Sequence, residues 1–274
     1  MDPITKNILV PWDFTPSSNY ALEHAVKIAK IRNYNISLLH IIKHSKEEAN
    51  YQIKLNEIAR ETQSKTGIST TVLIQNGDVL TTISELASLP DTELVIMKTD
   101  GITGSQKYTG SRAIKIMRGS KSPFIVVQKS PMDSLFHKIV FPIDYRTENK
   151  EIVNSLLNLS KVYNGKIFIF KTLSNDKVFK KNISNNLNFA RMMFESKHID
   201  FEIHEGSGSK DYSIEVNEYA QSIGADLIII QLQRNLTLTK FLFGVKEQQI
   251  IANPYKIPVM VVNPKEIKVY AGFK

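Results

Sequence analysis

The chain contains an internal repeat, and no other feature of the sequence constrains its fold as strongly. The segment Asn7-Ile-Leu-Val-Pro-Trp-Asp13 recurs as Lys138-Ile-Val-Phe-Pro-Ile-Asp144, and each copy is an apolar run that ends in Pro-x-Asp. Pro123-Phe-Ile-Val-Val127 recurs in the same order as Pro258-Val-Met-Val-Val262. Self-similarity at a long, nearly fixed spacing indicates duplicated structural units, so the sequence predicts two related domains in tandem.

The boundary between these domains is predicted at a short polar segment that contains a proline, residues 129–134. The first domain then comprises residues 1–131 and the second comprises residues 132–274. A chain of 274 residues of which 42% are hydrophobic is long enough for two domains, each with its own core. The last ten residues match nothing in the first half and would form an added edge strand or a tail.

Within each half, short β-branched runs alternate with amphipathic stretches of helical length, a pattern that predicts a parallel sheet with helices on both faces. We expect strands near 8–11, 36–42, 70–74, 94–98 and 124–127, and again near 139–141, 166–170, 201–204, 227–230 and 259–262. The first helix is expected to follow Thr15-Pro16 as its N-cap and first residue. Further helices are expected near 46–66, 81–88, 111–118, 148–163, 181–197, 212–223 and 246–252. The predicted fold class is α/β, with two doubly wound, five-stranded parallel sheets of the Rossmann-like type.

The composition excludes several classes of protein. The chain has no cysteine, which removes disulfides, thiolate metal sites and cysteine nucleophiles. Its start lacks the pattern of a signal peptide, and no apolar run approaches the roughly 18 residues of a transmembrane helix, so we expect a cytoplasmic protein with no membrane contact. The net charge of +8 comes from lysines spread along both halves, often beside acidic residues. That distribution favours a solvated surface over a nucleic-acid partner.

Two features of the first half are expected to meet at the carboxyl edge of its sheet, where open parallel sheets bind ligands. Asp13 follows the first strand and could accept hydrogen bonds from a ribose or a base. The stretch 97–111 follows the fourth strand, contains Gly101, Gly104 and Gly110, and leads into a helix. Glycines let a backbone approach a phosphate closely, and a helix N-terminus supplies free N–H groups.

On these residues alone, two interpretations of the glycine-rich stretch remain open. It could hold an anion, or it could be a loop that needs glycines only in order to turn. It lacks the Gly-Lys-Ser/Thr ending of a Walker A loop, and it does not open the helix after the first strand, as the dinucleotide-binding pattern does.

Over essentially its whole length, the sequence resembles the universal stress protein family in its tandem form. The resemblance lies in Pro-x-Asp after the first strand of each half, in Leu38-Leu-His-Ile41, and in Gly110-Ser111 before a helix and a Pro-Phe-Ile-Val-Val strand. It implies a fold like that of the adenine nucleotide alpha hydrolases, with the two domains related by a pseudo-twofold axis. It also implies a role in the stress response and a site for ATP, with or without Mg, in the first domain.

The same resemblance assigns roles to individual residues. Members of the family that bind ATP carry Gly-x2-Gly-x9-Gly-Ser/Thr after the fourth strand. By position, Asp13 would contact the adenosine end, the backbone of Ile41 would read the adenine, and Gly101, Gly110 and Ser111 would hold the phosphates. Gly104 lies outside the family pattern, and we add it as a further source of backbone freedom.

The sequence departs from the family pattern in both halves. Lys98 stands at the position of the family's first glycine, and eight residues rather than nine separate Gly101 from Gly110. A lysine there could either fill the phosphate pocket or neutralise a phosphate. In the second half Asp144 is kept, but the stretch 231–245 retains only Gly244. We expect that half to be empty or to bind something else, because side chains keep the backbone away from a phosphate.

The remaining candidates are weaker. His40 and His44 are four residues apart, but a strand is expected to end between them, so the geometry of a helical metal site does not apply. The Gly206-Ser-Gly-Ser209 segment precedes a helix and could either cradle an anion or simply connect a strand to that helix. We assign no catalytic residue and no metal ligand.

Three functions remain open. The first is a regulatory module that binds ATP or a related adenine nucleotide and thereby changes its contact with an unidentified protein partner. The second is an interaction scaffold that has lost nucleotide binding, and the third is a slow ATPase, which is least favoured because no base, metal pair or arginine finger can be assigned. Members of the family pair through their last strands, which implies that strands 124–127 and 259–262 face each other within this chain.

Overall fold

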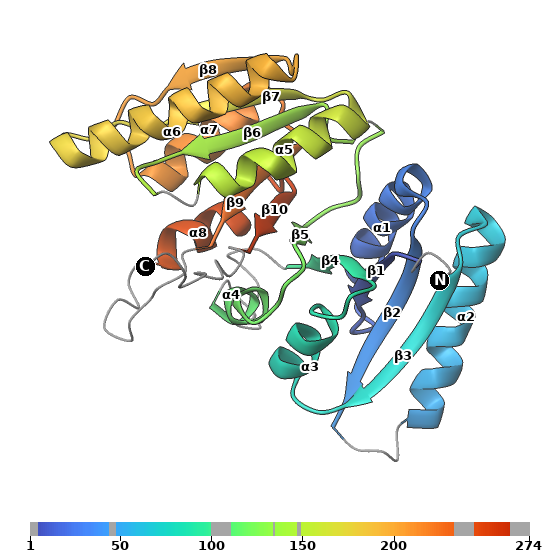
Figure 1. The fold of residues 1–274 in the computed structure, drawn as a ribbon. Coiled ribbons are helices and arrows are strands. Elements are labelled where there is room, and N and C mark those ends of the chain that lie inside the picture. Colours follow the sequence, from blue (N-terminus) through green and yellow to red (C-terminus); the bar gives the residue numbers. More distant parts are fainter. Residues whose placement is uncertain are drawn as a thin grey trace, which may run out of the picture.

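The computed structural model describes residues 5–43, 48–99, 111–133, 135–146, 149–232 and 244–263. Strands and helices alternate within each half of the described chain (Figure 1). The strands are β1 (Asn7–Pro11), β2 (Asn35–Ile42), β3 (Thr70–Asn76), β4 (Thr92–Lys98), β5 (Phe124–Val127), β6 (Lys138–Ile143), β7 (Lys166–Lys171), β8 (Phe201–Glu205), β9 (Leu227–Gln231) and β10 (Val259–Val262). The helices are α1 (Ser18–Arg32), α2 (Glu48–Thr66), α3 (Val79–Leu86), α4 (Ser111–Arg118), α5 (Asn149–Tyr163), α6 (Lys177–Ser196), α7 (Tyr212–Ser222) and α8 (Gly244–Ile251).

All ten strands form one sheet in the order β3-β2-β1-β4-β5-β10-β9-β6-β7-β8. Within each half every strand pair is parallel, and only β5 and β10, the last strands of the two halves, pair antiparallel. The predicted fold class, two doubly wound five-stranded parallel sheets, is confirmed. The strand order of the first half reverses between β1 and β4, so a crevice is expected beyond the carboxyl ends of these two strands.

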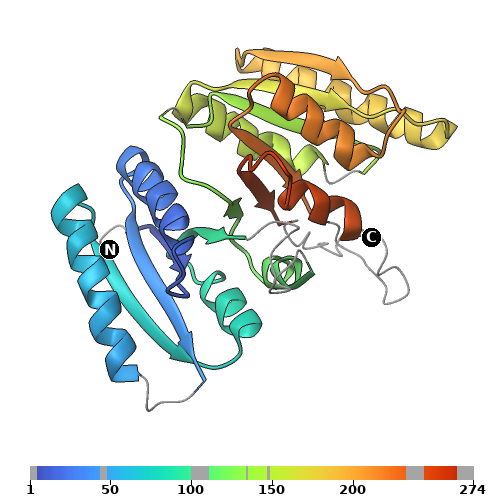
Figure 2. The ribbon, with the colours of Figure 1, turned by 180° about the vertical axis from the view of Figure 1, so that it is seen from behind.

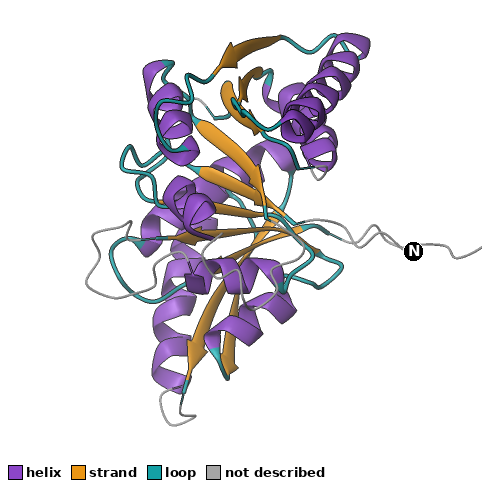
Figure 3. Ribbon diagram, turned by 90° about the vertical axis from the view of Figure 1, so that its left-hand side faces the viewer, coloured by secondary structure: helices purple, strands orange, loops and turns teal. Residues whose placement is uncertain are grey.

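Helices cover both faces of this sheet (Figure 3). Buried side chains of α1, α2, α5 and α6 pack on one face, and those of α3, α4, α7 and α8 pack on the other. The strands are therefore apolar on both sides: in β1, Ile8 and Val10 enter the first core and Leu9 enters the second. No helix in the described part of the chain is long and apolar enough to cross a membrane.

The junction of the two halves is closed by two amide side chains in equivalent positions. Gln128 directly follows β5, and its side chain donates to the carbonyl of Asn253 beyond α8, at 3.1 Å. Asn263 directly follows β10, and its side chain donates to the carbonyl of Ser120 beyond α4, at 2.7 Å. Figure 2 shows the two strands meeting between the halves, with α4 and α8 on the same side of them. Each half thus supplies a side-chain amide donor to a carbonyl group just beyond the last helix of the other half.

Helix starts are where the sequence-based boundaries differ most from the structure. The predicted N-cap of the first helix, Thr15, is wrong: α1 begins at Ser18 with Ser17 as the capping position. The reason is that the Thr15 hydroxyl donates to the Asp13 carboxylate instead. In contrast, α6 begins four residues earlier than predicted because the Asp176 side chain accepts from two backbone N–H groups of its first turn.

Candidate functional site

Asp13 lies at the carboxyl edge of the sheet, two residues beyond β1. The chain turns sharply behind it, since Phe14 adopts a φ of 59°. Oδ1 of Asp13 accepts three hydrogen bonds: from the backbone N–H of Thr15 at 3.1 Å, from the Thr15 hydroxyl at 2.6 Å and from the Ser18 hydroxyl at 2.6 Å. These contacts fix the carboxylate at the start of α1, with its second oxygen directed elsewhere.

That second oxygen forms an ion pair with Lys98. Nζ of Lys98 lies 3.0 Å from Oδ2 of Asp13, and the pair joins the ends of the adjacent strands β1 and β4. The side chain of Lys98 is only 15% exposed, whereas that of Asp13 is 51% exposed. The lysine is therefore the more buried partner of the pair, at the point where the strand order reverses.

The contacts of Asp13 keep it ionised. Partial burial acts to raise the pKa of its carboxyl group, but hydrogen bonds from Ser18, Thr15 and Lys98 outweigh burial and lower the pKa to about 2. At neutral pH the carboxyl edge of the sheet therefore carries a fixed negative charge that is paired with Lys98.

Aromatic rings flank this carboxylate on the α1 and α2 face. Phe14 lies edge-on to His40, with ring centroids 4.9 Å apart, and Tyr51 of α2 lies against both. Nδ1 of His40 is 2.7 Å from the carbonyl of Trp12, so it donates to the backbone. No group of metal-binding side chains occurs among the residues that the structure describes, and His44 lies outside them. The three rings pack against one another as part of the fold.

A groove of about 960 Å³, which Phe14 also lines, lies between α1 and α2. Its lining includes Trp12, Phe14, Thr15, Leu22, Val26 and Ile58. Neither Asp13 nor Lys98 borders it. The groove therefore does not include the Asp13–Lys98 ion pair at the strand-order reversal.

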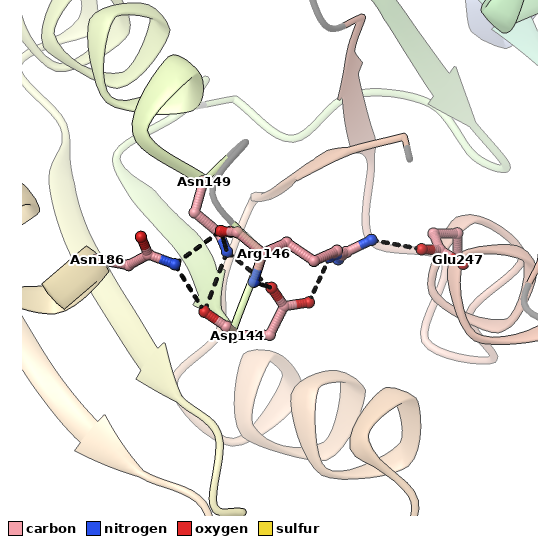
Figure 4. Close-up of polar contacts among 5 residues, drawn as sticks. All are labelled: Asp144, Arg146, Asn149, Asn186 and Glu247. Carbon is pink, nitrogen blue, oxygen red and sulfur yellow. Dashed lines mark hydrogen bonds and ion pairs between the residues drawn. The ribbon is translucent and has the colours of Figure 1, made fainter. Parts of the chain in front are cut away.

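The equivalent position in the second half is filled by a buried ionic network (Figure 4). Nε of Arg146 lies 2.6 Å from Oδ2 of Asp144, and a terminal nitrogen of the same guanidinium lies 2.7 Å from Oε1 of Glu247 on α8. The side chains of Asn149 and Asn186 donate to the Asp144 and Arg146 carbonyls, and Asn149 also donates to the Asp144 carboxylate at 2.7 Å. The guanidinium thus links the end of β6 to α8, the helix that follows β9.

Burial acts to lower the pKa of Arg146, but the charges of Asp144 and Glu247 outweigh it and hold the pKa above its usual value. Arg146 is therefore a permanent cation held between Asp144 and Glu247. Burial also raises the pKa of the neighbouring Tyr212 well above its usual range, so the tyrosine stays neutral beside this network.

Comparison with known proteins identifies the fold. The profile of the universal stress protein family matches residues 5–128. The first half of the chain is therefore similar in sequence to the universal stress protein family. None of the curated proteins matches the sequence.

Among solved structures, a universal stress protein from Archaeoglobus fulgidus is 17% identical with a TM-score of 0.75, and the match covers 95% of this chain and 97% of that one. Two shorter universal stress proteins match about half of this chain. One, in complex with cAMP, is 18% identical, with a TM-score of 0.38 and coverage of 47% and 100%. The other, from Archaeoglobus fulgidus in complex with dAMP, is 14% identical, with a TM-score of 0.37 and coverage of 48% and 99%.

The structure brings together some of the residues predicted for the universal stress protein site. Ile41 lies on β2, beside β1, and Asp13 follows β1 at the same end of the sheet because Pro11 pairs with Leu39. Ser111 is the first residue of α4. Gly101, Gly104 and Gly110 lie outside the described residues, so their proposed role as a phosphate loop stays a prediction.

Two features of the second half were not predicted from the sequence. The residues that fill the second crevice were not predicted, and the only signal was an arginine two residues after the second Pro-x-Asp, where the first half has Thr15. The segment at 206–209 is occupied as well: Oε1 of Glu215 accepts from the backbone N–H of Ser209 at 3.0 Å and from the Ser207 hydroxyl at 2.5 Å. This loop holds a carboxylate of its own chain.

Proposed function

We propose that the first half of this chain binds an adenine nucleotide, ATP or a close relative, and acts as a regulatory module of the stress response. The observation that carries the proposal is the ionised Asp13 at the reversal of strand order, opposite the end of β2. A fixed carboxylate at that place can accept hydrogen bonds from hydroxyl groups. The similarity of the first half to the universal stress protein family predicts that these are the hydroxyl groups of a ribose. Gly101, Gly104, Gly110 and the start of α4 at Ser111 would then hold the phosphates.

We further propose that a single nucleotide binds per chain. The crevice of the second half contains the guanidinium of Arg146, which is held between Asp144 and Glu247. An entering nucleotide would have to separate both of these ion pairs, and breaking a buried pair is costly. Residues 1–131 and 132–274 would therefore differ in role, with the first as the ligand-binding domain and the second as a structural and interaction domain.

Catalysis is disfavoured by the same geometry. A general base works best when its pKa is close to the operating pH, whereas the pKa of the Asp13 carboxyl is lowered to about 2. Asp13 is also engaged by Thr15, Ser18 and Lys98, which suits an acceptor of fixed hydrogen bonds. A scaffold that has lost nucleotide binding is the second candidate, favoured by the Lys98–Asp13 ion pair at the place where a ligand would enter.

Native mass spectrometry of the purified chain, followed by isothermal titration with ATP, ADP and AMP, tests the proposal. We expect one nucleotide per chain and a melting temperature that rises with ligand concentration. Gly110→Val should abolish binding, because its side chain would fill the predicted phosphate loop. Gly244→Val is the matched control in the second half and should leave binding unchanged.

A chain that carries no nucleotide and shows no heat of binding at millimolar ligand would contradict the proposal and favour the scaffold. Loss of binding in Gly244→Val but not in Gly110→Val would move the site to the second half.

A further inference from the structure

Exposed apolar side chains gather where the chain enters α6. Leu173 lies in the segment between β7 and α6, and Val178 and Phe179 lie in the first turn of the helix. Their exposed fractions are 45%, 63% and 38%. Single exposed apolar residues are common on protein surfaces, but a group of them in one short stretch is typical of a contact surface. We call these three residues the apolar patch.

The ring of Phe179 is held in place by a second ring. It stacks on Tyr145, directly after the second Pro-x-Asp motif, with ring centroids 3.9 Å apart and an angle of 8° between the planes. In the first half, the equivalent residue Phe14 meets Tyr51 of α2 at 5.3 Å and 32°, and His40 packs against both rings. The described part of the second half places no third ring on its pair. Phe179 is therefore a fixed aromatic side chain that remains partly exposed, the kind that anchors contacts between proteins.

Three lysines flank the apolar patch. Lys177 is the first residue of α6, and Lys180 and Lys181 follow in its next turn. All three side chains are exposed, and none of them forms an ion pair with a carboxylate in the part of the chain that the structure describes. The nearby carboxylate of Asp176 instead accepts hydrogen bonds from two backbone N–H groups of the same turn. The start of α6 therefore carries an uncompensated positive charge.

This charge does not help the helix to form. The N-terminus of a helix carries a partial positive charge, so acidic residues are favoured there and lysine is disfavoured. The first turn of α6 contains no acidic residue, whereas α2, the equivalent helix of the first half, begins with Glu48. Positive charge and exposed apolar surface thus meet where neither stabilises the chain. Such local conflicts occur in natural proteins mainly at functional sites.

We propose that the apolar patch and its three lysines form a docking surface for an acidic segment of a partner protein that also carries apolar side chains. The apolar patch receives the partner's apolar side chains at the centre of the contact, and the lysines pair with its carboxylates at the rim. The surface belongs to the second half alone, because α6 joins the last two strands of the sheet, away from the β5–β10 junction (Figure 1). The inference rests on the proposed role of the second half as an interaction domain, but it does not require a nucleotide.

The test uses the intact chain without nucleotide and a short fluorescein-labelled peptide in which glutamate alternates with leucine. Fluorescence anisotropy should show binding that weakens as salt rises. Phe179→Ala and the triple variant Lys177→Gln/Lys180→Gln/Lys181→Gln should each weaken it by roughly tenfold or more, as truncation of an anchor residue does. Met192→Ser is the matched control. Met192 is 58% exposed further along the same helix, and its loss should leave binding unchanged.

A second measurement needs no peptide and separates docking from folding. The variant Lys177→Glu/Lys180→Glu should melt at the same temperature as the wild type or higher, because acidic side chains suit the start of a helix, yet it should not bind the peptide. A lower melting temperature would show that these lysines serve the fold, which would overturn the inference.

The inference is also overturned if the peptide does not bind the wild type, if the triple lysine variant binds it as tightly as the wild type does, or if Met192→Ser weakens binding as much as Phe179→Ala. The same holds if phosphatidylglycerol vesicles or a single-stranded RNA bind at this surface and the peptide does not. Because the assay contains no nucleotide, its failure leaves the proposed nucleotide site of the first half intact. Conversely, a chain that binds the peptide but no nucleotide would contradict only the nucleotide site.

Discussion

Replacing Arg146 by methionine is expected to destabilise the second half strongly. The substitution keeps most of the aliphatic stem but removes the charge that lies between Asp144 and Glu247, whose side chains are only 12% and 11% exposed. Both carboxylates would remain in the same partly buried site without their cation. Removing one partner of a buried ion pair costs about 3–5 kcal/mol, and because the network retains slight exposure we expect about 3 kcal/mol.

That loss is large compared with a typical total stability of roughly 5–15 kcal/mol. It can be measured by urea unfolding, followed by far-ultraviolet circular dichroism for the whole chain. The fluorescence of Trp12, the only tryptophan, is a second probe, because this side chain is buried in the first half. We expect the midpoint from circular dichroism to fall more than the midpoint from tryptophan fluorescence.

The control is Lys171→Met, which removes a surface ion pair with Glu205 in the same half, at 3.0 Å. Exposed pairs contribute about 0–1 kcal/mol, so this variant should stay close to the wild type. A triple variant that also carries Asp144→Asn and Glu247→Gln should recover part of the loss, because no uncompensated charge remains. The reasoning is refuted if Arg146→Met alone lies within about 1 kcal/mol of the wild type.

Two further predictions concern the junction and the response to acid. Gln128→Ala and Asn263→Ala should each destabilise the chain by about 1–3 kcal/mol, since each leaves carbonyl groups of the opposite half without their donor. Chemical unfolding measures this loss of stability. If neither variant is destabilised, the two amides do not hold the halves together. His24 is buried and its Nε2 donates to the carbonyl of Lys129, and burial lowers its pKa to about 4. The neutral His24 side chain therefore contributes roughly 3 kcal/mol to the free energy of unfolding. This contribution is present above the unfolded-state pKa of 6.5 and is lost as the pH falls from 6.5 towards 4. His24→Leu should flatten the stability profile in that window, and an unchanged profile would show that another group is responsible.

The repeat in the sequence was enough to predict the fold, because Pro-x-Asp and the last strand mark equivalent points in both halves. The antiparallel contact of β5 with β10 then joins the two sheets into one. Helix starts could not be predicted as well, because they depend on which of several nearby groups a polar side chain forms its hydrogen bond with. Thr15 has the character of an N-cap, but its hydroxyl donates to Asp13, and the helix starts later.

The candidate site was predictable only where its residues end a repeated motif or stand at a position of a known family pattern. Asp13 was found because it ends a repeated motif, and Lys98 because it replaces a glycine in a known pattern. Of the partners of Arg146, only Asp144 was found, since Glu247 lies in a helix far along the chain and Asn186 lies in another. No spacing in the sequence links these residues, and only the folding of the sheet brings them together.

The divergence of the two halves follows from where each one places its cation. An open parallel sheet leaves a crevice at the reversal of strand order, and a carboxylate fixed there needs a positive partner when it is partly buried. In the second half that partner is bound on both sides, so the charges are balanced within the chain and the crevice becomes part of the core. In the first half the partner is a lysine on the strand that leads towards the predicted phosphate loop, and its carboxylate is half exposed. A duplicated fold can thus keep one crevice for a ligand and close the other by changing which residue neutralises the same aspartate.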